Sequence, residues 1–135
     1  MEVARQLRNI AWQVRRWAEN EYTGSDGCGW YDNDLCGLCA VASGEIWKRL
    51  KAVGADPLIV YCDMDWSGHC YVLVEGYVID VTATQFFRKM PRVVVRKHTR
   101  AKQEWWDISQ TFKNIRSFRD WQKRSHWPEN QTVKI

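Results

Sequence analysis

The chain has 135 residues, 45% of them hydrophobic, and a formal net charge of +4 at pH 7. This composition is typical of a globular protein, and the length suits a single domain over residues 1–135. The chain has no run of 18 apolar residues and begins with a charged segment, so we expect neither a membrane span nor a secretory signal. Five cysteines without an export signal favour reduced thiols and a cytoplasmic location.

The first part of the chain has the pattern of two helices joined by a loop. Apolar residues recur every three or four positions across residues 2–19, which predicts an amphipathic helix. Residues 20–37 are rich in Gly, Asp and Asn and predict a long loop. A second helix is predicted from about Leu38 to Val53, where Gly54 is a typical C-terminal stop. Its buried face is expected to comprise Cys39, Ala42, Ile46, Leu50 and Val53.

The remainder has the pattern of an antiparallel sheet. Apolar runs predict strands in residues 57–63 and 92–98, and residues 69–86 are predicted to form a hairpin that turns at Glu75 and Gly76. In the C-terminal tail, a short helical stripe comprises Ile115, Phe118 and Trp121. Helices that precede a run of strands predict an α+β fold, with the N-terminal helices packed on an antiparallel β-sheet.

Cys39 is the candidate nucleophile because it lies in the first turn of the second predicted helix. The thiolate is the reactive form of cysteine, and a helix N-terminus or a neighbouring imidazole lowers the pKa of a thiol. Cys36, by contrast, falls in the preceding loop.

The hairpin register predicts a histidine–carboxylate pair for this thiol. If the turn is centred on Glu75 and Gly76, paired residue numbers sum to 151, and His69 and Asp80 become diagonal neighbours on one face. Diagonal Cα atoms are about 7–8 Å apart, which is within reach of a hydrogen bond between the two side chains. We therefore expect Cys39 as the nucleophile, His69 as the general base and Asp80 as the carboxylate that orients it.

The motifs "GLCAVAS" and "GHCYVLVEGYVIDVTATQF" resemble the transglutaminase-like branch of the papain-like cysteine hydrolases, over about residues 35–87. This resemblance implies a papain-like fold, a Cys39–His69–Asp80 triad and thiol-dependent chemistry on an amide or thioester carbonyl. It implies a cysteine protease, isopeptidase or deamidase of a protein or peptide substrate, or an acyltransferase, and no cofactor. Asn33 lies six residues before Cys39, where papain-like enzymes often carry an oxyanion-hole glutamine.

Two other functions remain open on the sequence. One is an inactive papain-like binding module. The other is a zinc-stabilised nucleic-acid-binding protein, with Cys36, Cys39, His69 and Cys70 as the possible ligands. We expect no metal, because His69 and Cys70 are adjacent on a strand and point to opposite faces. A thioredoxin-like pair is not expected either, because a loop rather than a strand precedes the cysteines.

The other candidate residues are expected to be structural. Cys62 and Cys70 lie in apolar strands and are predicted to be buried thiols, whereas Cys28 and Cys36 are predicted to be loop thiols. His98 and His126 are predicted to be surface residues. Residues 88–102 contain seven Lys or Arg residues, which protect an edge strand or, with Trp105 and Trp106 nearby, contact nucleic acid. Without a recognised motif, we do not expect nucleic-acid binding.

Overall fold

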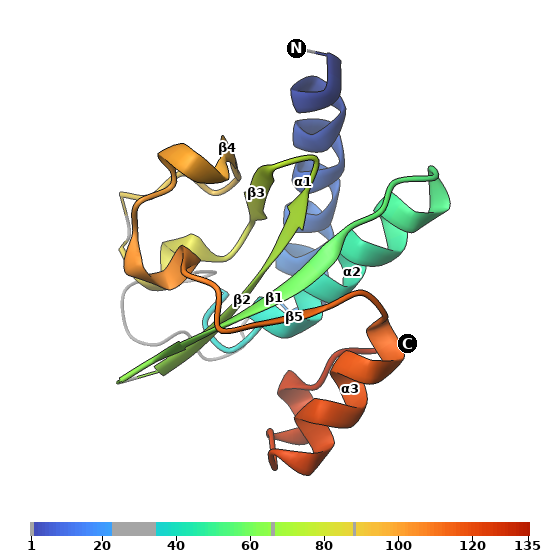
Figure 1. Cartoon of the computed structure of the whole chain (residues 1–135), viewed down its shortest axis with the longest axis vertical. Coiled ribbons are helices and arrows are strands. Elements are labelled where there is room, and N and C mark those ends of the chain that lie inside the picture. Colours follow the sequence, from blue (N-terminus) through green and yellow to red (C-terminus); the bar gives the residue numbers. More distant parts are fainter. Residues whose placement is uncertain (1, 23–34, 66, 88) are drawn as a thin grey trace.

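Figure 1 shows the computed structural model, which describes residues 2–22, 35–65, 67–87 and 89–135. Within these residues the fold is α+β. The α-helices are α1 (Glu2–Glu21), α2 (Cys39–Ala52) and α3 (Ile115–Arg124). The strands are β1 (Leu58–Met64), β2 (Ser67–Val74), β3 (Tyr77–Asp80), β4 (Val94–Lys97) and β5 (Gln110–Phe112). Short 3₁₀ helices are η1 (Ala83–Gln85), η2 (His98–Arg100), η3 (Glu104–Trp106) and η4 (Glu129–Gln131).

The five strands form one antiparallel sheet in the order β4-β3-β2-β1-β5. Helices α1 and α2 lie together on one side of it (Figure 1). Their apolar stripes pack on alternate residues of the central strands, and the resulting cluster includes Leu7, Val14, Ile46, Leu50, Val72 and Ile79. The opposite face is covered by the segment that carries η3, with Trp106 at the centre of a second cluster. The sheet is therefore buried on both faces near its middle.

The hairpin between β2 and β3 has the predicted register. Val74 pairs with Tyr77, Leu73 with Val78, and Val72 with Ile79, as expected when paired numbers sum to 151. Glu75 and Gly76 have φ angles of 52° and 77°, which is the left-handed backbone that a two-residue hairpin turn of the primed type requires. This turn places Asp80 at the end of β3 on the same face as His69.

Helix α2 begins at Cys39, one residue after the predicted start, and points this residue into a third cluster. The cluster joins α2 to β1, β2 and the C-terminal part of the chain, and it comprises Cys39, Ala40, Ile59, Cys70, Ile115, Phe118 and Val133. In Figure 1, α3 and the segment after it lie at one end of the sheet, beneath α2. The C-terminal part of the chain therefore packs against the start of α2.

Several predicted elements need correction. The second strand of the hairpin ends at Asp80, and η1 follows where more strand was expected. Val53 is 70% exposed because it caps α2 rather than continuing its buried face. Strand β5 was not predicted.

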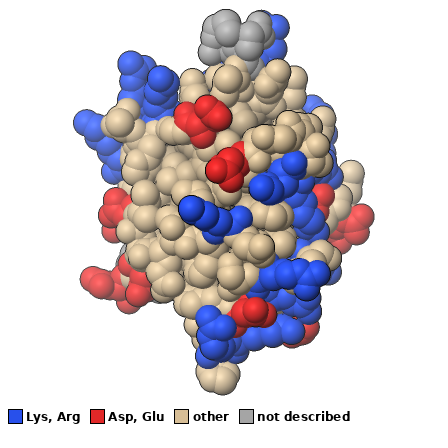
Figure 2. Space-filling model, turned by 45° about the vertical axis from the view of Figure 1, so that its right-hand side comes forward, with Lys and Arg blue, Asp and Glu red and all other residues tan. Residues whose placement is uncertain are grey.

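The surface carries charges of both signs. On the face in Figure 2, Lys and Arg side chains are interspersed with Asp and Glu, with uncharged residues between them. Over the described residues, no helix is long and apolar enough to cross a membrane.

Candidate active site

The thiol of Cys39 lies at the N-terminal end of α2 and is 6% exposed. Cys70 and His69 are the side chains that act most strongly on its titration. The hydrogen bond from Cys70 lowers the pKa of Cys39 well below its usual value of 9.0 against the opposing effect of burial, and the charge and hydrogen bond of His69 lower it further. The pKa of Cys70 is raised by burial and by the nearby Cys39, so this second thiol stays protonated and acts as the donor. Cys39 is thus the activated thiol of the pair.

His69 lies on β2 and is fully buried, with its Nε2 atom 2.6 Å from Oδ2 of Asp80. The two side chains are thus hydrogen-bonded on one face of the sheet, as the register predicts. Burial opposes a charge on the imidazole, but the Asp80 carboxylate and the Cys39 thiolate outweigh it and raise the pKa of His69 to about 9. Because Nε2 donates to Asp80, Nδ1 is the nitrogen that exchanges a proton with Cys39.

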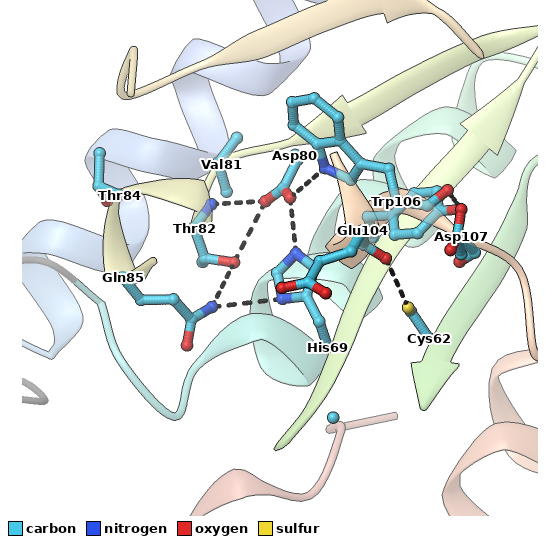
Figure 3. Close-up of polar contacts among 12 residues, drawn as sticks. Cys62, His69, Asp80, Val81, Thr82, Thr84, Gln85, Glu104, Trp106 and Asp107 are labelled. Atoms are coloured by element: carbon cyan, nitrogen blue, oxygen red, sulfur yellow. Dashed lines mark hydrogen bonds and ion pairs between the residues drawn. The ribbon is translucent and has the colours of Figure 1, made fainter. Parts of the chain in front are cut away.

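Asp80 accepts hydrogen bonds on both of its carboxylate oxygens. Oδ1 accepts from the backbone N–H of Thr82 at 2.8 Å and from its hydroxyl at 3.2 Å. Oδ2 accepts from the indole Nε1 of Trp106 at 2.7 Å, as well as from His69 (Figure 3). Burial would raise the pKa of Asp80, but the His69 charge and these donors lower it overall. The carboxylate is therefore held ionised and in one orientation.

Trp106 is a site residue that the sequence analysis missed. It was considered for a nucleic-acid surface, yet it is 1% exposed and its indole N–H is bonded to Asp80. Its carbonyl oxygen accepts from the Tyr71 hydroxyl at 2.6 Å, which secures η3 against β2. No local pattern indicates this role, because Trp106 follows Asp80 by 26 residues and meets it only through the fold.

Gln85 was also missed, although it lies in the "DVTATQ" run. It ends η1, and its Nε2 lies 3.3 Å from Nδ1 of His69 and 3.3 Å from the Thr82 hydroxyl oxygen. Figure 3 shows His69 between Asp80 on one side and Gln85 on the other. Gln85 therefore brings an amide beside the nitrogen that faces Cys39.

A pocket of about 390 Å³ opens above the thiol. Its walls come from α2 and the segment before it, from the sheet and η1, and from the segment after α3, and its lining includes Cys39, Tyr61, Gln85, His126, Trp127 and Gln131. A pocket of this size is large enough for a side chain or a short peptide segment. His126 is exposed, as predicted, but it contributes to this wall. Asn33 lies outside the described residues.

The other predicted thiols and histidines have mixed outcomes. Cys62 and Cys70 are buried and free, as predicted. Cys36 is disulfide-bonded, so the expectation of a loop thiol is wrong there, and the expected reduced state does not hold for it. A disulfide sulfur is not a thiolate ligand, which removes Cys36 from any zinc site. His98 is half-buried and 3.2 Å from the Trp106 carbonyl, so it has a partner that was not foreseen.

Within the described residues, no group of three or more His, Cys, Asp or Glu side chains is arranged to hold a metal ion. Comparison with known proteins adds no relative: no protein-family model matches the chain, and neither a curated protein nor a solved structure matches it significantly.

Proposed function

We propose that the protein is a papain-like or transglutaminase-like cysteine hydrolase that acts on an amide or thioester carbonyl of a protein or peptide. One observation carries the proposal: a helix-opening thiol with a lowered pKa lines a pocket and lies beside a buried, hydrogen-bonded His69–Asp80 pair. The burial of ionisable groups costs free energy. Such groups are typical of active sites, where they activate a nucleophile.

In the proposed reaction, the Cys39 thiolate attacks the carbonyl carbon and the carbon–oxygen π electrons move to oxygen. The backbone N–H of Cys39, in the first turn of α2, has no acceptor within the helix and is one donor for this oxyanion. The Gln85 amide, beside Nδ1 of His69 in the same pocket, is the second. When the oxyanion collapses, the leaving amine or thiol takes a proton from Nδ1 of His69.

In the second half of the reaction, water hydrolyses the acyl-thioester on Cys39. His69 takes a proton from water, whose oxygen attacks the thioester, and the Cys39 thiolate leaves as the acid is released. Asp80 keeps the imidazole in one tautomer throughout, while the Thr82 and Trp106 donors keep Asp80 ionised.

The free Cys39 thiol agrees with the predicted cytoplasmic location, whereas the Cys36 disulfide does not support it.

The proposal is tested by hydrolysis of p-nitrophenyl acetate, an activated ester that needs no knowledge of the natural substrate. We expect a burst of about one nitrophenol per chain, followed by slower turnover, as the acyl-enzyme forms and hydrolyses. Cys39→Ser and His69→Ala should each abolish both phases, and Asp80→Asn should leave a small residual rate.

The matched control is Cys62→Ser, because Cys62 is another buried, free thiol but its pKa is raised by burial. It should keep the burst. If the burst survives in Cys39→Ser, Cys39 is not the nucleophile and the hydrolase proposal is wrong. The alternative of a binding module would then be favoured.

A further inference from the structure

A second pocket, of about 400 Å³, lies on a different part of the molecule and is strongly basic. Among the described residues, its lining includes four cationic residues, Arg8, Arg96, Lys97 and Arg100, and no acidic residue. It shares no lining residue with the pocket of Cys39. Figure 1 shows β4, which carries two of these cations, beside the N-terminal half of α1.

The fold accounts for only one of these cations: the guanidinium of Arg96 lies 5.8 Å from the ring centre of Trp106, on the opposite face of β4 from Lys97. None of the four forms a salt bridge with a carboxylate in the described part of the chain. Arg96 and Lys97 protect the exposed edge of β4 against pairing, which is a common role for cations on an edge strand. That role does not account for Arg8, which comes from α1, or for Arg100, which comes from η2. Like charges gathered without acids repel one another until an anion neutralises them.

The rest of the lining is apolar or aromatic. Ala4 and Val95 form apolar wall, and Tyr77 is half-buried with the ammonium of Lys97 5.8 Å from its ring centre. A pocket of a few hundred Å³ with apolar walls and converging polar groups suits a small organic ligand. A nucleic-acid duplex would instead need a basic stripe along the surface rather than one concave pocket.

We propose that this pocket binds a small organic phosphate, with the phosphate held by the arginines and the organic part packed on Tyr77 and Val95. Arginine is suited to this task because its planar guanidinium donates two parallel hydrogen bonds to phosphate oxygens. Arg8, Lys97 and Arg100 come from three different elements, so a compact multianion contacts these three at once. This site is independent of the chemistry proposed for Cys39.

The test is a calorimetric titration with adenosine diphosphate at 150 mM salt, with adenosine as the uncharged probe. We expect saturable binding of the diphosphate with a Kd below about 1 mM, and no binding of adenosine. The double variant Arg8→Gln/Arg100→Gln should weaken binding by about tenfold or more, because each charge-assisted contact contributes strongly. Both residues are exposed, so the variant should keep the Tm of the parent.

The matched control is Arg116→Gln/Arg124→Gln, which removes the same charge from exposed positions of α3. It should leave the Kd within about twofold. If both double variants weaken diphosphate binding equally, the binding reflects general charge attraction and the proposed site is wrong. The absence of saturable binding up to about 1 mM would also contradict the proposal. If a 20-base-pair DNA duplex binds about tenfold more tightly than the diphosphate, the ligand of this surface is nucleic acid and the small-ligand proposal is wrong.

Discussion

At the scale of single residues, the candidate site is a set of groups that share protons. Between pH 6.5 and 9 the folded Cys39–His69 pair holds one proton, on His69, because the pKa of Cys39 is lowered and that of His69 is raised to about 9. The unfolded pair also holds one proton in this range, but on the thiol. Equal proton numbers in both states mean that the pair adds no pH dependence to the free energy of unfolding there.

Cys39→Ala should remove this balance of proton numbers and make the free energy of unfolding depend on pH. In the variant the folded His69 keeps its proton, raised in pKa by Asp80, while the unfolded imidazole loses its proton above pH 6.5. The stability from this histidine is fully present below pH 6.5 and is lost as pH rises through the folded pKa of His69, which in the variant lies below the wild-type value of about 9 because the contributions of Cys39 are absent. The free energy of unfolding should therefore fall by up to about 1.4 kcal/mol per pH unit relative to wild type. Urea unfolding at pH 6, 7, 8 and 9 measures the difference.

The control for this experiment is Cys62→Ala, which removes a buried thiol that pairs with His69 across β1 and β2 but is not among the groups that shift the pKa of His69. Its stability curve should run parallel to that of wild type. If Cys39→Ala also runs parallel, Asp80 alone does not hold the proton on His69, and the predicted pH dependence is wrong.

Trp106→Phe should reduce stability because it removes one donor from the buried Asp80 carboxylate. A hydrogen bond to a charged group contributes about 1.5–3 kcal/mol, and a buried acceptor without its donor costs a similar amount. We expect a loss of about 2–3 kcal/mol in the free energy of unfolding, measured by chemical denaturation. The matched variant is Trp105→Phe, because the Nε1 of Trp105 is buried without a hydrogen-bond partner among the described residues.

Trp105→Phe should therefore lower the free energy of unfolding by less than about 1 kcal/mol. Because Asp80 stabilises the fold above its unfolded pKa of 3.8 and loses this effect on acidification, Trp106→Phe should also unfold at a higher pH than wild type. Equal losses from the two tryptophan variants would mean that only ring volume matters.

At the scale of elements, α2 is held by the chain that follows α3. Gly44 lies in the middle of α2, where glycine normally weakens a helix, yet a Cβ at this position would overlap the side chain of Val133. Val133 is 2% exposed, and its N–H donates to the Gln122 side chain at 2.7 Å. The glycine is thus required by the close approach of the C-terminal segment rather than by the helix itself.

Gly44→Ala should therefore destabilise the protein by about 1–2 kcal/mol, although alanine is the better helix former by about 1 kcal/mol. Val133→Ala alone should also destabilise, because it leaves a cavity. The double variant should be more stable than the sum of the two losses by at least about 1 kcal/mol, since the overlap is gone. Additive losses in urea unfolding would show that the segment does not pack on Gly44.

Elements with a local cause were predictable from the sequence. The register of β2 and β3 followed from the Glu75–Gly76 turn, and the His69–Asp80 bond followed from the register. Strand β5 was not predictable, because its three residues are mostly exposed and show no alternation. Trp106 was missed for another reason: its donor reaches Asp80 across 26 residues, and only the completed fold brings them together.

At the scale of the whole molecule, the pocket of Cys39 is assembled from distant parts of the chain. Cys39 opens α2, Tyr61 comes from strand β1, and Trp127 follows α3. Trp127 is half-buried and packs with its ring centre 6.0 Å from that of Tyr61 and 5.9 Å from that of Trp121. The C-terminal segment therefore forms a wall that limits what reaches the thiol.

Trp127→Ala should widen the access to Cys39 and leave its pKa lowered, because Cys70 and His69, the residues that lower it, are unchanged. We expect iodoacetamide, which is small, to alkylate wild type and variant at similar rates at pH 7. Fluorescein maleimide, which is bulky, should react slowly with wild type and at least about tenfold faster with the variant, because a large aromatic wall has been removed. Mass mapping of the labelled peptide assigns the reaction to Cys39.

Trp12→Ala is the matched control for this experiment, since it removes an exposed tryptophan from α1, outside the pocket. Its ratio of maleimide to iodoacetamide rates should equal that of wild type. Both variants are compared at a temperature well below their Tm values, because Trp127→Ala also loses packing and costs stability. If the ratio does not change in Trp127→Ala, the wall seen around Cys39 does not restrict entry, and the size of a substrate is set elsewhere in the pocket.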